Sequence, residues 1–317
     1  GMAIILAPFF FIGHLLAFIL GYPMDGFSVP YVFGIYLGGI CYATLGLVMM
    51  RKVLKEYFKD WTIAIALLIL VLCTNFHHYA IFEVAMTHVP VFTLFSILIY
   101  NTLRWHQDQK WRYVIAIAVS LGLMGLIRPT ELIAVLIPLL WNVWSVESLK
   151  AKVQLVNDNW RQVLGIIGIC FLIGLPQFLY WKWASGDWLF YSYEHVHLDF
   201  LNAKIHDGLF SIRKGWLVYT PAMALALIGI IPMLFRNSKI SLSIILYVAI
   251  NIWIVFSWTI WWYGGSFGQR ALVQSYAMMS IPLGALIYYA FQQKWWKYGL
   301  GVAFLFCAWL NILQVYQ

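Results

Sequence analysis

The sequence has little charge and few cysteines. Only 10% of its 317 residues are Asp, Glu, Lys or Arg, whereas about 25% of the residues in a typical soluble domain are charged. Four cysteines are present, and each lies within an apolar run without the spacing of metal ligands: Cys41, Cys73, Cys170 and Cys307. The scarcity of charge excludes an ordinary soluble domain. The cysteine positions are typical of small core residues and give no indication of a cysteine-based metal site.

Apolar residues dominate the chain instead. Hydrophobic residues make up 63% of the sequence and aromatic residues 18%. A helix needs about 20 apolar residues to cross the hydrocarbon core of a bilayer. Runs of this kind, with charges only between them, predict an all-α polytopic transmembrane protein that forms one domain over residues 1–317. The expected spans lie near 31–50, 62–80, 88–103, 113–127, 131–146, 163–183, 216–235, 240–258, 271–291 and 297–315.

A further apolar run, MAIILAPFFFIGHLLAFIL, occupies residues 2–20. Two interpretations fit this run. It forms an eleventh span, or it lies along the membrane surface with Pro8 and His14 interrupting it.

The basic residues that give the net charge of +8 lie mainly in the loops between the expected spans. If the loop RKVLKEYFK is cytoplasmic, alternating spans place fourteen of the twenty basic residues on that side, as the positive-inside rule predicts. They are Arg51, Lys52, Lys55, Lys59, Arg104, Lys110, Arg112, Lys150, Lys152, Arg161, Arg236, Lys239, Lys294 and Lys297. The basic character is therefore topological, and no nucleic-acid partner is expected.

The remaining ionisable residues gather on the opposite, outer side. They include Arg128, Lys182, Lys204, Arg213, Lys214, Arg270, Asp25, Glu83, Glu131, Asp187, Glu194, Asp199 and Asp207, together with six of the eight histidines. Charges close to membrane depth are costly unless they are paired or functional. This distribution predicts a polar site on the outer face.

Two short segments supply candidates for that site. In NFHHYAIFEVAMTHV, residues 75–89, Glu83 and His88 are expected to contact a polar substrate, or else to belong to a hydrated turn. In LIRPTEL, residues 126–132, Arg128 is a candidate for the same site. Alternatively, Arg128 and Glu131 pair with each other at the (i, i+3) spacing of a helix.

The longest loop, about 184–215, is expected to be ordered because it is rich in aromatic residues. Loops of more than about 15 residues are commonly functional or disordered. Its HVHLD segment would bring His195, His197 and Asp199 to one face only if extended. Since no further ligand spacing is present, no metal site is expected.

Basic residues close to glycines lie just before two of the expected spans, at the outer ends of these spans. Arg213 and Lys214 occur in SIRKGW, and Arg270 follows WWYGGSFGQ, where Tyr263 precedes the glycine pair. Arginine binds phosphate oxygens in a bidentate manner, and lysine binds them as a point charge. The pattern indicates a phosphate held at headgroup depth. The simpler alternative is that these side chains extend to lipid headgroups.

Four segments together carry a family resemblance: NFHHYAIFEVAMTHVPVF, GLIRPTEL, GLFSIRKGWLVYTPAM and WWYGGSFGQRAL. In this order, separated by apolar spans, they resemble the bacterial membrane glycosyltransferases of the GT-C superfamily, in particular the family 39 or protein-mannosyltransferase-like group. The resemblance implies transfer of a sugar from a polyprenyl-phosphate carrier to an acceptor glycan, lipid or protein. It also implies a location in the bacterial cytoplasmic membrane, with the active face outward and no cofactor.

The resemblance further implies an acidic pair in a loop after the first helix of the family. Residues 2–20 resemble the segment that follows this loop, so we expect an N-terminally truncated chain, inactive by itself if the pair is essential. Because both ends of residues 2–20 would then lie outside, the resemblance favours an interfacial or re-entrant helix.

The resulting hypothesis assigns roles to seven residues. Arg270, Arg213 and Lys214 bind the donor phosphate, whereas Glu83, His88, Arg128 and Tyr263 line the sugar or acceptor site. The catalytic acidic pair is expected upstream of residue 1, with Glu83 as the in-chain candidate. A flippase or transporter of lipid-linked sugars and a non-catalytic membrane subunit remain as alternatives.

Overall fold

The computed structural model describes residues 1–191, 196–236 and 238–316, and every regular element in these ranges is helical. An isolated antiparallel bridge joins Leu198 to Trp258. The helices are α1 (Met2–Leu20), α2 (Val29–Leu54), α3 (Asp60–Leu72), α4 (Phe76–Ile81), α5 (His88–Gln107), α6 (Trp111–Ile127), η1 (Pro129–Val135), α7 (Leu136–Leu140), α8 (Val146–Asp158), α9 (Trp160–Ser185), α10 (Ile205–Phe210), α11 (Trp216–Tyr219), α12 (Ala222–Ile228), α13 (Ile230–Arg236), α14 (Ser238–Phe256), η2 (Arg270–Ser275), α15 (Tyr276–Gln292) and α16 (Trp296–Val315). The expected all-α class is confirmed.

Six helical segments in the described part of the chain are long and apolar enough to cross a membrane: Met2–Leu20, Val29–Leu54, Trp160–Ser185, Lys239–Phe256, Arg270–Gln292 and Trp296–Val315. The last five coincide with the spans expected at 31–50, 163–183, 240–258, 271–291 and 297–315. The other five expected spans correspond to helices that are shorter or less apolar. The expected number of about ten spans is therefore not established.

Local chemistry explains why three of the expected spans are not continuous helices. In 62–80, the Thr74 hydroxyl donates to the Leu70 carbonyl at 2.5 Å and accepts from the Phe76 amide at 3.1 Å, so the helix stops and restarts. In 131–146, Asn142 has a φ of 64° and Ser145 forms a capping box that opens α8. In 216–235, Pro221 separates α11 from α12.

Residues 2–20 form one unbroken helix that contains both Pro8 and His14, so neither residue interrupts it. The helix ends at Gly21 in the left-handed conformation, with a φ of 72°. It lies beside α2, and at Gly13 a Cβ atom would stand only 2.8 Å from the Pro30 carbonyl oxygen. The interfacial or re-entrant placement of this helix stays a prediction.

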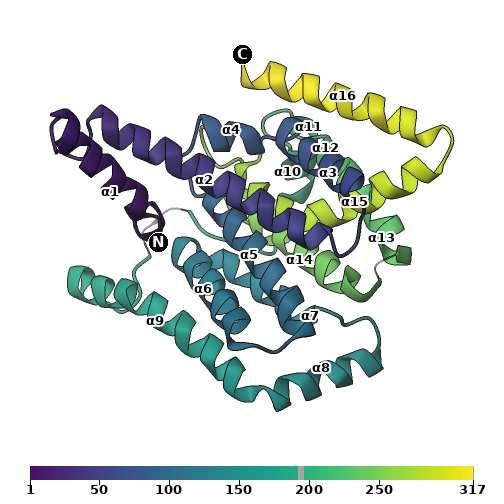
Figure 1. The fold of residues 1–317 in the computed structure, drawn as a ribbon, viewed down its shortest axis with the longest axis horizontal. Helices are drawn as coiled ribbons and strands as arrows, with labels where there is room; N and C mark the ends of the chain where they lie inside the picture. The colour runs from purple at the N-terminus through teal and green to yellow at the C-terminus, as the bar shows by residue number, and fades with distance from the viewer. Residues whose placement is uncertain (192–195, 237, 317) are drawn as a thin grey trace.

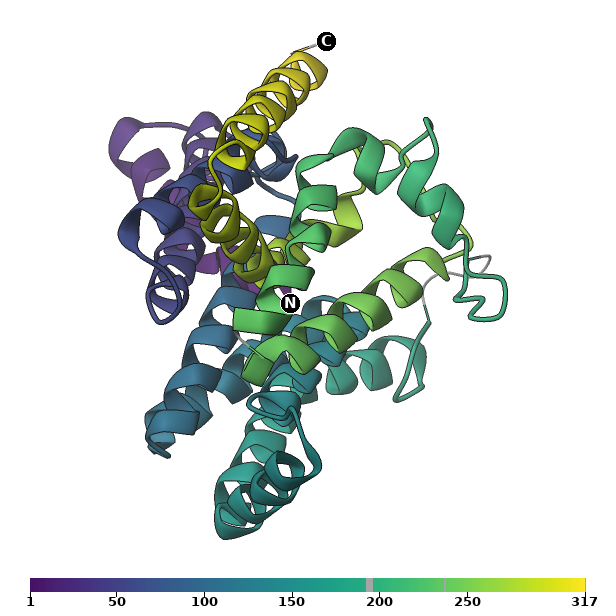
Figure 2. The same cartoon turned by 90° about the vertical axis from the view of Figure 1, so that its right-hand side faces the viewer.

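The helices form a bundle whose centre contains α5 and α15, both buried along most of their lengths. In both ribbon views α16 lies at one edge of the bundle and α8 at the opposite edge (Figures 1 and 2). Because η2 leads directly into α15, residues 270–275 are anchored in the most deeply buried helix.

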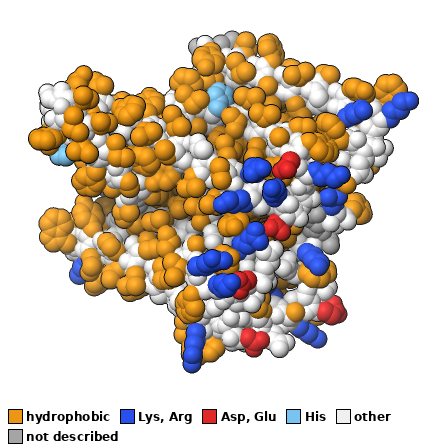
Figure 3. Space-filling model, viewed as in Figure 1, with side chains coloured by type: hydrophobic (Ala, Val, Ile, Leu, Met, Phe, Trp, Pro, Cys, Tyr) orange, Lys and Arg blue, Asp and Glu red, His pale blue; other side chains and the backbone are white. Residues whose placement is uncertain are grey.

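Charged side chains are unevenly distributed on the surface. Figure 3 shows Lys and Arg gathered on the right-hand part of the visible face, whereas hydrophobic side chains cover most of the left-hand part. This segregation agrees with the clustering of basic residues in the loops of the sequence.

Candidate functional site

The site is built around a turn that joins α14 to η2, which we call the glycine turn (residues 261–270). Tyr263, Gly264 and Gly268 have φ values of 55°, 68° and 56°, so the backbone repeatedly enters the left-handed region. Within the turn, the buried Gln269 donates from Nε2 to the Trp261 carbonyl at 3.1 Å. The turn is therefore ordered by its own polar contacts.

Helix α4 and the residue before it form hydrogen bonds to the glycine turn through buried side chains. The Phe267 carbonyl accepts hydrogen bonds from the Tyr79 hydroxyl at 2.8 Å and from Asn75 Nδ2 at 3.2 Å. Asn75 Oδ1 in turn accepts from the Tyr276 hydroxyl at 2.7 Å. These bonds connect the segment after α3 to the turn and to the start of α15.

Lys214 and Arg213 approach the same turn from the segment before α11. Lys214 Nζ donates to the Gly264 carbonyl and, at 2.9 Å, to the Ser266 hydroxyl. The Arg213 guanidinium lies over the Trp262 ring, 3.9 Å from its centroid, and its side chain is exposed. Burial and the neighbouring charges of Arg270 and Arg213 lower the pKa of Lys214 below its ordinary value.

Arg270 is the first residue of η2 and is half-buried. Its Nη1 lies 3.7 Å from the sulfur of Met86, in the turn between α4 and α5. Glu83 occupies that same turn, where its carbonyl accepts from the Met86 amide at 2.9 Å. The Glu83 side chain is exposed. Burial lowers the pKa of His78, and the charge of Glu83 acts against this shift.

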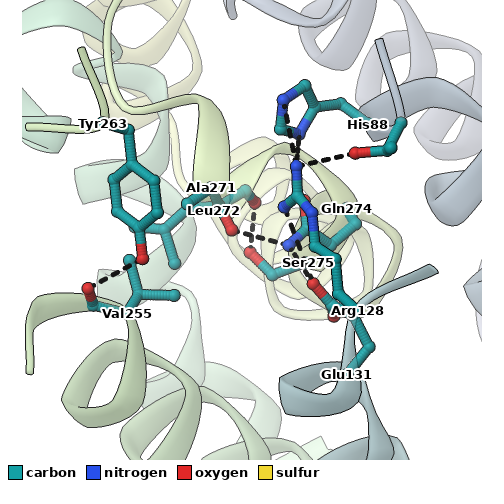
Figure 4. A network of polar contacts seen from close by, with 10 residues as sticks. His88, Arg128, Glu131, Val255, Tyr263, Ala271, Leu272, Gln274 and Ser275 are labelled. Atoms are coloured by element: carbon teal, nitrogen blue, oxygen red, sulfur yellow. Dashed lines mark hydrogen bonds and ion pairs between the residues drawn. The ribbon is translucent and has the colours of Figure 1, made fainter. Parts of the chain in front are cut away.

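Arg128 lies between α6 and η1 and is the centre of a polar network (Figure 4). Its Nη2 donates to the Thr87 hydroxyl at 2.6 Å and lies 3.4 Å from both ring nitrogens of His88. Its Nη1 stands 3.9 Å from Glu131 Oε1, so the predicted (i, i+3) pair is present. The Arg128 side chain keeps 26% of its surface exposed, whereas His88 is fully buried.

Glu131 connects this network to η2. Gln274 Nε2 donates to Glu131 Oε1 at 2.6 Å and also to the Ala271 carbonyl at 2.6 Å. Both side chains are buried, with exposures of 3% for Glu131 and 1% for Gln274. Residues 143 positions apart in the sequence are thus hydrogen-bonded in the interior.

Tyr263 lies across the network from His88 in Figure 4, and its hydroxyl donates to the Val255 carbonyl at 2.9 Å. Burial raises the pKa of this phenol, while the positive charges of Arg128 and Arg270 act in the opposite direction. Both arginines are therefore close enough to influence one side chain.

The structure brings most of the predicted residues to one region. Arg128 and His88 share the network, Arg270 begins the same short helix that holds Gln274, and Lys214 binds the glycine turn. Arg213 and Glu83 lie at exposed positions on the edges of this region. The sequence analysis missed Gln274, Asn75 and Tyr79. A polar residue inside an apolar run was the available signal for Gln274.

The HVHLD segment gives no support for a metal triad in the part of the chain that can be described. His195 lies outside the described residues, and the Asp199 carboxylate accepts hydrogen bonds from the Asn202 amide and side chain at 3.1 and 2.9 Å. Over the described ranges, His, Cys, Asp and Glu side chains form no group of three that could hold a metal ion.

Comparison with known proteins identifies the family. Residues 15–181, more than half of the chain, match the family described as dolichyl-phosphate-mannose-protein mannosyltransferase. The matched range contains Glu83, His88, Arg128 and Glu131, whereas the glycine turn and Lys214 lie beyond it. No curated protein and no solved structure matches the chain. With its six candidate membrane spans, the chain belongs to the dolichyl-phosphate-mannose-protein mannosyltransferase family of membrane glycosyltransferases.

Proposed function

We propose that the protein transfers a sugar from a polyprenyl-phosphate carrier to an acceptor on the outer face of the membrane. The observation that carries this proposal is the arrangement of cationic side chains around the glycine turn. Arg270 begins η2 at the end of the turn, Lys214 binds the turn, and Arg128 lies in the network that includes η2. Glu131 is the one buried carboxylate among the described residues, and it is paired with Arg128.

Transfer of a sugar from a phosphate carrier breaks the bond between the anomeric carbon and the phosphate oxygen. The departing phosphate gains negative charge, which fixed cationic groups stabilise in the transition state. We assign this role to Arg270 and Lys214, with Arg213 at the exposed edge. The prenyl tail would run down among the apolar helices.

The acceptor must lose a proton as it attacks, and a carboxylate is suited to receive it. Glu83 is the candidate within this chain, because it lies in the turn that carries Met86, the residue in contact with Arg270. His88, Arg128 and Tyr263 remain the proposed contacts of the sugar or acceptor. Tyr263 presents its hydroxyl to Val255, so its proposed contact would be made through the ring.

Replacement of Arg270 tests this function. One charge-assisted contact contributes about 1.5–3 kcal/mol, so Arg270→Ala is expected to slow transfer by about one to two orders of magnitude. Arg270→Lys should recover part of the loss, because the bidentate guanidinium is absent. The measurement is transfer of labelled mannose from a polyprenyl-phosphate donor by the purified full-length protein in lipid.

Arg161→Ala is the matched control, because Arg161 is an exposed arginine at the start of α9. It should transfer at the wild-type rate. Equal rates for wild type and Arg270→Ala would contradict the role of Arg270. A wild-type protein that moves the lipid-linked sugar across a vesicle membrane without transferring it would instead support the transporter alternative.

A further inference from the structure

The two short 3-10 helices of the site, η1 and η2, share the same arrangement of residues. Each interrupts the start of an apolar helical segment, and each begins at an arginine: Arg128 is the N-cap of η1, and Arg270 is the first residue of η2. Each also carries a buried polar side chain in its interior, Glu131 in η1 and Gln274 in η2. The 2.6 Å hydrogen bond between these two side chains joins the two helices.

Stability alone does not account for the hydrogen bond between Glu131 and Gln274, which we call the bridge. A buried carboxylate is costly unless it is paired and hydrogen-bonded, and apolar residues of similar volume serve equally well in a core. Glu131 Oε2 and Gln274 Oε1 are buried without a hydrogen-bond partner among the described residues. The bridge is therefore only partly compensated, which suggests a role other than packing.

The contacts around Arg128 indicate what that role is. The guanidinium is held by Thr87 from the segment before α5 and by Glu131 from η1, and Glu131 is itself fixed by η2. Gln274 is fixed in addition by the Ala271 carbonyl, next to Arg270. The orientation of Arg128 is thus tied to the short helix that Arg270 begins.

We propose that Glu131 and Gln274 are positioning residues that hold Arg128 and Arg270 as a two-arginine clamp for one phosphate group of a prenyl monophosphate. This inference rests on the proposed function, from which the prenyl-phosphate donor is taken. Two guanidinium groups can each offer paired N–H donors to phosphate oxygens, and a fixed separation lets both reach the same group. Consecutive residues contact the two groups, because the Met86 sulfur lies 3.7 Å from Arg270 Nη1 and the Thr87 hydroxyl accepts from Arg128 Nη2 at 2.6 Å.

Farnesyl phosphate, a short prenyl monophosphate, is a suitable probe, with farnesol as the ligand that lacks phosphate. Gln274→Met removes the bridge but leaves the Glu131 side chain in place, and we expect it to weaken farnesyl phosphate binding about tenfold, as for the loss of one charge-assisted contact. Arg128→Ala should weaken binding at least as much as Gln274→Met.

Gln162→Met is the structural control. Gln162 also links helices through a side-chain amide: its Oε1 accepts from Trp105 Nε1 and its Nε2 donates to the Gln109 carbonyl, each at 2.7 Å. This variant should lower the unfolding temperature without changing the affinity for farnesyl phosphate. If Gln274 supported only the fold, Gln274→Met would likewise lower the unfolding temperature and leave the affinity for farnesyl phosphate unchanged.

The outcomes separate the clamp from the proposed function. Wild-type protein that binds farnesyl phosphate no better than farnesol, or equally well after Arg270→Ala, would remove the phosphate site and the clamp with it. If wild type binds and Arg270→Ala does not, yet Arg128→Ala or Gln274→Met binds normally, the clamp is overturned while the proposed donor site stands.

Discussion

Lys214 has a special position among the cations of the site, because its ammonium group is half-buried against the glycine turn. Burial and the charges of Arg270 and Arg213 lower its pKa from the ordinary value of 10.5. A lysine with a lowered pKa loses its charge at a lower pH than usual. We therefore expect the affinity for farnesyl phosphate to fall with rising pH, beginning below pH 10.5. Titration of binding above about pH 8 isolates this effect, since the phosphate, with a second pKa of about 6, is then fully ionised.

Lys214→Arg provides the comparison, because arginine stays charged throughout this range. The alkaline loss of affinity should be absent or much smaller in this variant. The same alkaline loss in wild type and Lys214→Arg would show that another group titrates.

At the residue scale, the sequence was informative about local pairs and uninformative about distant ones. The pairing of Arg128 with Glu131, the alternative interpretation drawn from their spacing of three residues, is present in the structure. The bridge from Glu131 to Gln274 could not be predicted, because no local pattern relates two positions in separate helices. For the same reason, the contact between Arg270 and Met86 emerged only from the fold.

At the element scale, the glycines of the glycine turn make different demands on the backbone. Gly265 does not have a positive φ, and a Cβ there would meet no atom within 4 Å. Gly264 has equal space but a φ of 68°. Gly268 combines a φ of 56° with a Cβ position 3.2 Å from Tyr219 Cβ and 3.4 Å from Asn75 Nδ2. The three positions therefore separate backbone strain from crowding.

Alanine substitutions should follow this order. Gly265→Ala is expected to be neutral, and Gly264→Ala should destabilise the protein by about 1–2 kcal/mol, the cost of a left-handed residue with a Cβ. Gly268→Ala should destabilise the protein more than Gly264→Ala does, because the new Cβ would crowd Tyr219 and Asn75. It should also reduce transfer, because relief of this crowding would displace the backbone at Phe267 and Arg270. Thermal unfolding in lipid and the transfer assay provide the two measurements. A Gly268→Ala protein as stable and active as Gly265→Ala would show that the turn is not held as described.

The sequence predicted the long apolar helices well and the interrupted ones poorly. Spans such as 163–183 and 297–315 are uniformly apolar, and the structure contains them within a few residues. In 62–80 and 216–235 the hydropathy was also high, but Thr74 and Pro221 change the backbone hydrogen bonding, which a hydropathy average does not detect. The two 3-10 helices were missed for a related reason, since Arg128 and Arg270 were treated as ends of spans.

At the scale of the whole molecule, the proposed reaction depends on which side of the membrane the site faces. Fourteen basic residues lie in the loops expected to be cytoplasmic, and Lys and Arg gather on one part of the surface in Figure 3. With the expected alternation of spans, the positive-inside rule predicts that the glycine turn faces outward. Labelling can measure this orientation.

Single cysteines at three exposed loop or surface positions provide the test. Asp25 lies between α1 and α2, where its carboxylate accepts from the Phe27 and Ser28 amides, Asp207 lies in α10, and Lys110 lies between α5 and α6. A membrane-impermeant maleimide should label Asp25→Cys and Asp207→Cys in intact cells, but Lys110→Cys only after lysis. The unmodified chain is the control, because its four cysteines lie in apolar runs. The reverse pattern would place the glycine turn on the cytoplasmic side, and the proposed transfer on the outer face would then be wrong. Labelling of Asp207→Cys without Asp25→Cys would instead show an odd number of membrane crossings between these two positions, which would contradict the even number that the expected spans predict.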